Sequence, residues 1–351
     1  MIKLFYPEQL YDSRFRGDLF PLLKPFIKKG AITDKERIAM YAISSSDIKI
    51  VATPHKADWV ILPKSWNYYV ENNLLDKAIL IIQEASLHNK TVLSFTHGDF
   101  GVHIPNLKNI IVFRSSGERS QLPSYHKGLP SFNKDPLKTY YSTKNIFINN
   151  YSKKPMIGFC GLSNSSSMNA FKEIIRTFLR NFKYKINLSN ELPQKLRSTS
   201  KLRSKVLNSI KQSPKLESKF IERNKYRAGA NNKDQREKTT LEFFNNIKNT
   251  DYTICVRGAG NFSVRLYETL AMGRIPVFIN TDCILPLADT IDWKKHVVWI
   301  EENEIGNIEE KIVQFHEKLN PDSFKNLQLQ NRKLWEEQLT LGGFFKKELG
   351  V

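Results

Sequence analysis

Cysteine is scarce in this chain of 351 residues, and the three that occur, Cys160, Cys255 and Cys283, lie far apart. There is no Cys-x-x-Cys pair and no cluster of cysteine with histidine, which argues against a structural zinc site and a disulfide framework. Each cysteine lies in or directly after an apolar run. We therefore expect three reduced thiols that are buried in the fold.

Long apolar runs are also missing. The longest, such as Ala78–Ile82 and Ile110–Phe113, fall far short of the ~20 residues that a helix needs to span a bilayer. The first ten residues lack the apolar centre of a signal peptide and have the pattern of a strand. These absences predict a soluble protein that binds membranes at most at their surface.

Acidic residues are outnumbered, 35 against 54 basic ones, for a net charge of +19. The stretch Glu191–Thr240 alone has 14 Lys and Arg against 5 Asp and Glu. Such concentration indicates a local patch or arm rather than a uniformly basic surface. Anionic lipid headgroups, an anionic polymer or RNA would suit this patch, and a solvated helical face is the alternative explanation.

Short apolar runs rich in β-branched residues recur along the chain and alternate with helical patterns, which is typical of parallel sheets covered by helices. The predicted strands are residues 2–6, 48–52, 58–63, 91–95, 109–113, 146–149, 156–161, 252–256, 275–279 and 296–300. One helical pattern has an apolar stripe at spacings of three and four residues, which predicts an amphipathic helix. The stripe comprises Phe171, Ile174, Ile175, Phe178, Leu179 and Phe182.

A polar segment that ends in proline, Asn149–Pro155, separates two series of strands and predicts a domain boundary. The predicted fold class is α/β, with two Rossmann-like domains built on parallel sheets. We assign residues 1–150 to the first and 151–322 to the second, and we interpret the basic stretch at about 192–240 as a helical insertion or mobile arm. Residues 323–351 are expected to form a helix that packs back on the first domain.

The densest group of charged side chains follows the predicted strand at 252–256. Two glycines and the first turn of a predicted helix come directly after this strand, where unpaired backbone N–H groups and the helix dipole attract a phosphate. The residues concerned are Arg257, Gly258, Gly260, Asn261, Ser263, Arg265 and Glu268.

Two explanations compete for this charged turn. An Arg265–Glu268 ion pair three residues apart would stabilise the start of the helix. Alternatively, Arg257 and Arg265 hold a diphosphate through bidentate bonds, and Glu268 accepts hydrogen bonds from a ribose. We favour the second, because Arg257, the glycines and Ser263 have no part in the first. The stretch is not a dinucleotide fingerprint, since a serine stands where the third glycine belongs, nor a phosphate loop with Gly-Lys-Ser/Thr.

Residues 249–286, "NTDYTICVRGAGNFSVRLYETLAMGRIPVFINTDCILP", resemble the donor-binding signature of exostosin-family glycosyltransferases. That signature runs Pro-Arg-Gly, then Ser-x-Arg-x-x-Glu, then Gly-x-x-Pro-Val, and this chain departs from it only by Val256 in place of the first proline. Shorter likenesses precede it in the order of the family: "ADWVILP" at Ala57–Pro63, "FTHGDFG" at Phe95–Gly101 and "IGFCG" at Ile157–Gly161.

The resemblance implies the GT-B architecture, two facing Rossmann-like domains, with the nucleotide-sugar on the second. It also implies transfer from a nucleoside diphosphate donor, with UDP as our choice, and inversion at the anomeric carbon. Arg257, Arg265 and Ser263 would stabilise the departing diphosphate, Glu268 would hold the ribose, and Arg227 is a further candidate for the diphosphate. No Asp-x-Asp pair occurs in the chain, so we expect no metal ion and no other cofactor.

An inverting displacement needs a base for the acceptor hydroxyl, and the first domain would supply it. Asp99 and His97 come directly after a predicted strand and are the leading candidates. Asp58 and His55 are further candidates. For each of these residues a structural role, such as a loop cap, is the alternative.

The expected acceptor is a glycan or a lipid-linked saccharide in the synthesis of a surface polysaccharide. A cytoplasmic enzyme, peripheral at the inner face of the plasma membrane, fits the reduced thiols and the basic charge. The main alternative is a protein that binds nucleic acid or another polyanion through the basic stretch. No zinc finger, aromatic RNA-binding signature or helix-turn-helix signal supports that alternative, so we expect no nucleic-acid partner.

Overall fold

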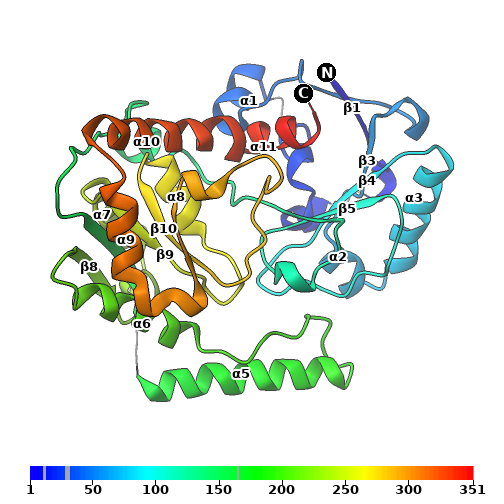
Figure 1. Cartoon of the computed structure of the whole chain (residues 1–351). Coiled ribbons are helices and arrows are strands. Elements are labelled where there is room, and N and C mark those ends of the chain that lie inside the picture. Colours follow the sequence, from blue (N-terminus) through cyan, green and yellow to red (C-terminus); the bar gives the residue numbers. More distant parts are fainter. Residues whose placement is uncertain (11–12, 28–31, 164–165, 351) are drawn as a thin grey trace.

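The computed structural model describes residues 1–10, 13–27, 32–163 and 166–350, and it contains two separate parallel sheets (Figure 1). The first has six strands in the order β2-β1-β3-β4-β5-β6, and the second has five in the order β11-β10-β9-β7-β8. The strands of the first sheet are β1 (Ile2–Phe5), β2 (Ile48–Ile50), β3 (Trp59–Ile61), β4 (Val92–Phe95), β5 (Ile110–Arg114) and β6 (His126–Gly128). Those of the second are β7 (Met156–Leu162), β8 (Glu217–Arg223), β9 (Tyr252–Cys255), β10 (Ile275–Asn280) and β11 (Val298–Glu301). The expected α/β class with two parallel sheets is confirmed.

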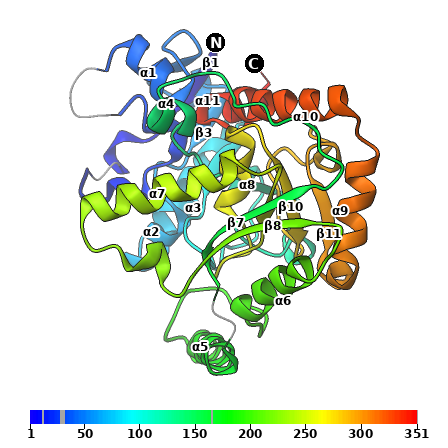
Figure 2. The same cartoon turned by 90° about the vertical axis from the view of Figure 1, so that its left-hand side faces the viewer.

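Helices connect the strands and cover the sheets (Figure 2). The first part of the chain contains α1 (Asp34–Tyr41), α2 (Trp66–Glu71), α3 (Leu75–Leu87) and α4 (Pro136–Tyr141). The second contains α5 (Ser167–Lys185), α6 (Thr199–Lys211), α7 (Lys233–Lys248), α8 (Val264–Ala271) and α9 (Ile308–Glu317). The last are α10 (Pro321–Leu334), a π-helical turn at Trp335–Leu339, and α11 (Leu341–Glu348). None of the helices in the described ranges is long and apolar enough to cross a bilayer.

Burial along the strands matches their places in the sheets. Every residue of the inner strands β4 and β9 is buried, as expected for a parallel strand with helices on both faces. The edge strand β8 carries Lys219 and glutamates and is only partly buried. Charged residues on an edge strand protect the open row of backbone groups from pairing with another chain.

An apolar core joins the two sheets at the end of the chain. Phe344 and Phe345 of α11 contact Phe113 of β5 with ring centroids 5.7 and 5.5 Å apart. The same cluster of buried residues includes Leu266 and Phe278 of the second domain. The carboxyl-terminal helices therefore run from the second sheet across to the first, as Figure 1 shows.

The interpretation of residues 192–240 as an insertion or mobile arm is wrong. The stretch contains α6, whose Val206, Leu207 and Ile210 are fully buried in the core of the second sheet, and it contains the whole of β8. β8 pairs with β7 over seven residues. The lysines of this stretch are exposed, and the apolar positions between them are too sparse to stand out in the sequence. The expected strand at 146–149 is also wrong, since these residues have no regular structure.

Candidate functional site

The loops at the carboxyl ends of the two sheets meet between the domains. After β9, the backbone N–H of Asn261 donates to the hydroxyl of Ser116, which follows β5, at 2.8 Å. Gly260 lies against Asp99, which follows β4: a Cβ at Gly260 would come within 2.8 Å of a carboxylate oxygen of Asp99. Ligands of open α/β sheets bind at such carboxyl edges, so this junction is a candidate ligand-binding site.

Four arginines bring their guanidinium groups to the carboxyl edge of the second sheet. Arg223 ends β8, Arg257 follows β9, Arg265 is in the first turn of α8, and Arg203 comes from α6. Arg203 was not predicted, because nothing in the basic stretch around it distinguishes one arginine from its neighbours.

Backbone carbonyl groups hold most of these guanidinium groups. Arg203 donates to the carbonyl oxygens of Leu162 at 2.7 Å and of Arg257 at 3.1 Å. Arg265 donates to the carbonyl oxygen of Cys160 at 2.9 Å, and its guanidinium carbon lies 4.5 Å from the ring centroid of Phe159. These partners carry no formal charge, so they position Arg203 and Arg265 without neutralising them. Arg223 differs, because it pairs with the carboxylate of Glu242 at 2.5 Å.

Each of the four arginines keeps a buried Nε that has no hydrogen-bond partner in the described part of the chain. Burial lowers the pKa of Arg257 and of Arg265, and burial together with the neighbouring charge of Arg265 lowers the pKa of Arg203 to about 10. Unsatisfied donors on crowded cations make an anion the natural ligand for this edge.

A cavity of about 240 Å³ opens beside Arg257. Its cationic lining residues are Arg176 and Arg180 of α5, Lys195, Arg197 and Arg257. The single carboxylate in the lining, Glu173, accepts a hydrogen bond from the hydroxyl of Ser198 at 2.7 Å. Three of these cations have acidic partners outside the lining: Arg180 pairs with Glu191 at 3.1 Å, Arg197 with Glu302 at 3.0 Å, and Lys195 with Glu118. The cavity adjoins the arginines at the edge of the sheet through Arg257.

Glu268 lies one turn into α8 and has no hydrogen bond or ion pair within the described ranges. The expected alternative, a structural Arg265–Glu268 ion pair, is therefore not formed. Burial raises the pKa of Glu268 to about 7, against the opposing effects of Arg265 and then Arg227. The charge of Glu268 also contributes to a raised pKa of Tyr140, after burial. A partly buried carboxyl group without a partner has its acceptor oxygens available for a ligand.

Ser263 is the N-cap residue of α8, but its hydroxyl makes no capping hydrogen bond. Arg227 lies on an exposed turn with a left-handed backbone, φ 48°, and its charge acts on Glu268. A Cβ added at Gly258 would have no heavy atom within 4 Å, so packing in the free protein does not require a glycine there.

Asn261 has a different role from the predicted one. It is fully buried, and its amide donates to the carbonyl oxygens of Gly117 at 3.1 Å, Thr281 at 2.8 Å and Asp282 at 3.0 Å. Its side-chain oxygen accepts from the hydroxyl of Thr281 at 2.6 Å. The hydrogen-bonding groups of its side chain are therefore occupied, and Asn261 joins the two domains instead of leaving its amide free for a nucleotide-sugar.

The candidate bases fall on two opposite edges of the first sheet. His97 and Asp99 follow β4 and lie at the carboxyl edge, next to the glycine loop. His97 Nε2 lies 2.7 Å from Oδ1 of Asp18, a residue that the sequence did not single out. Asp58 precedes β3, at the amino edge, and accepts a hydrogen bond from the backbone N–H of Lys3 at 2.7 Å.

Asp58 as a catalytic base is therefore a wrong prediction, because the amino and carboxyl edges of a parallel sheet lie at its opposite ends. His55 also precedes β3, and its ring lies 6.2 Å from that of His88, which follows α3. Asp58 and His55 both lie at the amino edge of the first sheet, which is opposite to the domain junction. Neither residue can therefore reach the arginines.

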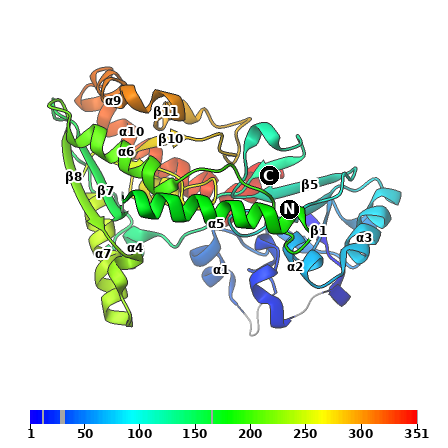
Figure 3. The same ribbon diagram turned by 90° about the horizontal axis from the view of Figure 1, so that it is seen from below.

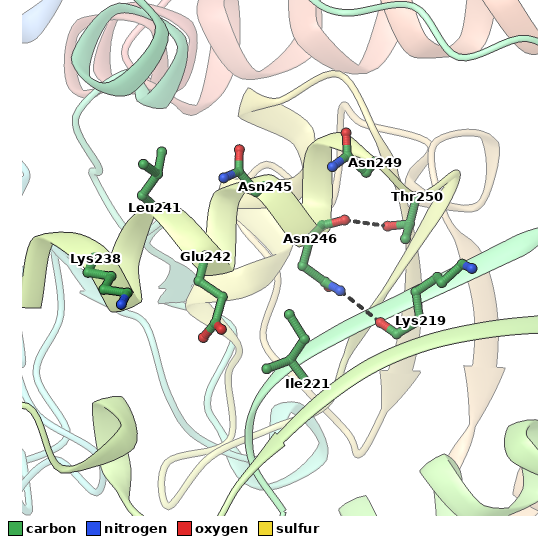
Figure 4. Close-up of a pocket in the computed structure, with 9 residues that line it drawn as sticks. All are labelled: Lys219, Ile221, Lys238, Leu241, Glu242, Asn245, Asn246, Asn249 and Thr250. Carbon is green, nitrogen blue, oxygen red and sulfur yellow. Dashed lines mark hydrogen bonds between the residues drawn. The ribbon is translucent and has the colours of Figure 1, made fainter. Parts of the chain in front are cut away.

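Two larger cavities lie elsewhere. A groove of about 450 Å³ runs between α7 and β8, where Asn246 donates to the carbonyl oxygen of Lys219 at 2.7 Å (Figure 4). Its carboxylate, Glu242, pairs with Arg223 at 2.5 Å and is not available to a ligand. A cavity of about 410 Å³ lies between β6 and the loop after β10, with Trp293 and Trp299 in its lining. Neither contains the group of unsatisfied cations.

Thiols and metal ligands add little to the site. Cys160 and Cys255 are buried and free, as expected, whereas Cys283 is free but only partly buried. Within the described ranges, no three histidine, cysteine, aspartate or glutamate side chains gather in a way that could hold a metal ion.

Residues 145–314, just under half of the chain, match the model of the Exostosin GT47 domain. "Probable glucuronosyltransferase 47 A" of Physcomitrium patens is 35% identical over 63 residues, 18% of this chain and 14% of that protein. "Probable beta-1,4-xylosyltransferase IRX10" of Arabidopsis thaliana is 30% identical over 67 residues, 19% of this chain and 16% of that protein. "Exostosin-1" of Drosophila melanogaster is 32% identical over 69 residues, 20% of this chain and 9% of that protein.

The matched part is about a sixth, or less, of the length of these curated relatives. Among solved structures, TarM aligns with 74% of this chain and 50% of its own, at 10% identity and a TM-score of 0.34. The matched family model covers β7 to α9 and with them every arginine and glutamate of the candidate site. Residues 145–314 of this chain are therefore similar to the Exostosin GT47 domain.

Proposed function

We propose that this protein is a glycosyltransferase that moves a sugar from a nucleoside diphosphate donor, with UDP as the nucleotide, to a hydroxyl of a glycan or lipid-linked saccharide. The observation that carries the proposal is the group of four arginines at the carboxyl edge of the second sheet, each with a buried Nε that lacks a partner among the described residues. A diphosphate offers the several charged acceptor oxygens that such donors require.

In this reaction the acceptor oxygen attacks the anomeric carbon, and the bond between that carbon and the diphosphate oxygen breaks. The electron pair of the broken bond stays on the diphosphate, whose growing charge needs stabilisation. Arg257 and Arg265 would supply it through fixed, partly desolvated donors, which is the task that electrostatic preorganisation performs best. Because the cations are already in place, we propose that no divalent metal ion takes part.

Glu268 would hold the ribose. It lies on α8, which begins beside the arginines, and its carboxyl group has no partner of its own in the part of the chain that the structure describes. A carboxylate accepts hydrogen bonds from both hydroxyls of a diol, and this arrangement is open to it here.

The acceptor proton would go to Asp99 or His97 on the first domain. A single displacement with a base on the opposite side of the cleft inverts the anomeric carbon. Asp99 is placed beside Gly260 of the donor loop, and His97 is paired with Asp18. Asp99 therefore lies at the domain junction, and His97 lies two residues before it in the same loop, on the side from which a base would face a donor on the second domain.

Thermal unfolding with a panel of ligands tests the donor site. UDP, GDP, ADP, CMP, NAD and a short RNA are each added in the presence of EDTA. A ligand at 100 times its dissociation constant adds about 2.7 kcal/mol to the free energy of unfolding, which raises Tm by several degrees. We expect UDP to raise Tm, and Arg265→Lys to abolish the increase, because an ammonium group cannot replace a bidentate guanidinium.

Arg236→Lys is the matched control, since Arg236 is exposed on α7 and should not affect the response to UDP. No increase with any nucleoside diphosphate would refute the proposal. An increase with RNA alone would favour the polyanion-binding alternative. Deletion of residues 192–240 is not a usable test of that alternative, because it would remove α6 and β8 from the fold.

A further inference from the structure

Helix α5 exposes an apolar stripe along its whole length. Amphipathic helices of globular proteins normally turn such a stripe toward the core. Here Phe171, Phe178 and Phe182 are 60%, 56% and 50% exposed. The other residues of the stripe, Ile174, Ile175 and Leu179, are exposed too, and so is Met168 in the first turn of the helix. Figure 3 shows α5 on the outside of the molecule, crossing beneath both sheets.

The opposite, polar face of α5 fastens the helix to the protein. Glu173 accepts from the hydroxyl of Ser198 at 2.7 Å, and Asn181 donates to the carbonyl oxygen of Gln194 at 2.7 Å. The guanidinium carbon of Arg180 lies 3.8 Å from the ring centroid of Phe100 in the first domain. These contacts recur at helical spacing and fix the rotation of α5, so the apolar stripe is held outward.

Positive charge accompanies the stripe. Within α5 the only acidic residue is Glu173, whereas the basic residues are Lys172, Arg176, Arg180, Lys183 and Lys185. Lys172, Lys183 and Lys185 are exposed. A rigid helix with aromatic and aliphatic residues outward and lysines beside them has the features of a helix that lies in the interface of an anionic membrane.

We propose that α5 is the surface through which this protein docks on an anionic lipid bilayer. The apolar stripe would enter the boundary between headgroups and acyl chains, and the lysines would contact acidic headgroups. A second copy of the chain fits the stripe less well. A symmetric dimer would place the same basic helix against itself and bring like charges together.

Docking through α5 would also affect the candidate site, an effect that rests on the proposed function. Arg176 and Arg180 belong to α5 and line the cationic cavity beside Arg257. Docking would therefore hold that cavity close to the headgroups, where a lipid-linked saccharide presents its sugar. The basic stretch at 192–240, which the sequence suggested as the membrane contact, is mostly part of the second domain itself.

Co-sedimentation with vesicles tests the docking surface with the full chain. One set of vesicles contains phosphatidylcholine alone, and the other contains phosphatidylcholine and phosphatidylglycerol in equal parts. We expect binding to the second set, weakened by salt. The triple variant Phe171→Ser, Phe178→Ser and Phe182→Ser should lower the affinity at least about tenfold, because the apolar anchors are lost. Replacing Lys172, Lys183 and Lys185 by Gln should remove the preference for phosphatidylglycerol.

The control variant is Leu87→Ser with Leu329→Ser, which changes two exposed apolar residues on α3 and α10 and should bind vesicles as the wild type does. Unchanged Tm of the triple variant would show that it is folded, and UDP binding by this variant keeps the test separate from the donor site. The proposal is overturned by absence of vesicle binding in the wild type, or by binding that persists in the triple variant. It is also overturned if sedimentation shows a dimer that the triple variant loses.

Discussion

The imidazole Nε2 of His97 lies 2.7 Å from Oδ1 of Asp18, at the carboxyl edge of the first sheet. The same oxygen of Asp18 accepts a hydrogen bond from the hydroxyl of Ser65 at 2.6 Å, so the carboxylate is held in place. The backbone N–H of His97 also donates to the side chain of Asn67 at 3.1 Å. This pairing resembles the orienting arrangement that a histidine base requires, and it distinguishes His97 from Asp99 as the candidate base.

Asp18→Asn tests whether His97 takes the acceptor proton. If it does, the variant should lower kcat by about ten- to a hundredfold, because the amide cannot stabilise a protonated imidazole. The dissociation constant of the donor should stay the same, since Asp18 lies on the first domain. The measurement is the release of nucleoside diphosphate from the donor, together with donor binding and Tm.

Asp18→Glu is the conservative partner of this variant and should recover part of kcat. If Asp18→Asn leaves kcat unchanged while Asp99→Asn abolishes turnover, Asp99 is the base and His97 is not. A fall in Tm that accompanies the fall in kcat would instead indicate a structural role for Asp18.

Glu268 should make the protein less stable as the pH rises. Its pKa in the folded protein is raised to about 7, mainly by burial, above the ordinary value of 4.5. Between these values the folded protein holds a proton that the unfolded chain has released, so the free energy of unfolding falls with rising pH. Glu268→Gln should remove this contribution, up to about 3 kcal/mol. The measurement is urea unfolding of both proteins at about pH 5 and about pH 8. The change in the free energy of unfolding between the two pH values should be larger for the wild type than for Glu268→Gln.

The exposed Glu317→Gln is a suitable control, since it should leave the pH dependence of the wild type intact. A slope that is the same in the wild type and in Glu268→Gln would mean that the Glu268 carboxyl group is not desolvated in the folded protein. Addition of a nucleoside diphosphate should change the wild-type slope and leave that of Glu268→Gln unaffected, if the ribose contacts this residue.

Gly161, near the carboxyl end of β7, lies directly against the guanidinium group of Arg265. A Cβ at this position would come within 2.7 Å of a guanidinium nitrogen of Arg265. Gly161→Ala should therefore displace the guanidinium group and weaken UDP binding by about ten- to a hundredfold, because misplaced bidentate donors lose most of their benefit. Isothermal titration with UDP is the measurement. Gly306→Ala, where no heavy atom lies within 4 Å of the added methyl group, is the control and should bind UDP normally.

The sequence predicted some of these features better than others. The charged turn at Arg257 and Glu268 was found because its residues are neighbours in the chain, and the strand before it has a strong apolar pattern. Asp18 was missed because it lies in no recognisable motif and its partner, His97, is 79 residues away in the chain. Asn261 was misassigned, since an asparagine beside a glycine loop looks the same whether it binds a ligand or joins two domains.

The outward direction of the apolar stripe of α5 could not be predicted from the sequence, for a different reason. Periodicity in the sequence identifies one apolar face of a helix but does not say what covers it. The direction is set by Glu173, Arg180 and Asn181, whose partners lie in loops that the pattern does not describe. An amphipathic pattern therefore predicted the helix correctly and left its surroundings undetermined.

The ion pair of Arg332 and Asp135 should be a main support of the carboxyl-terminal helices. Arg332 of α10 donates to both oxygens of Asp135 at 3.0 and 2.7 Å, and both side chains are about nine-tenths buried. Burial opposes ionisation of Asp135, but the hydrogen bonds and charge of Arg332 outweigh it, so the pKa of Asp135 is lowered. Asp135→Asn should lower the free energy of unfolding by about 3 kcal/mol, because the buried guanidinium loses its bidentate carboxylate and keeps only the half-exposed Glu336, at 2.7 Å, as a charged partner.

The loss of stability caused by Asp135→Asn should become smaller at acidic pH. As the pH falls below the ordinary pKa of an aspartate, the unfolded chain takes up a proton at Asp135, and below the lowered pKa the folded wild type also loses the charge of this carboxylate. Urea unfolding at neutral and acidic pH measures this change. The control is Asp292→Asn: its partner Lys295 lies 3.3 Å away on the surface, with side chains 56% and 78% exposed, so this change should cost less than about 0.5 kcal/mol. Equal losses for the two variants would mean that the buried pair contributes no more to the free energy of unfolding than a surface pair does.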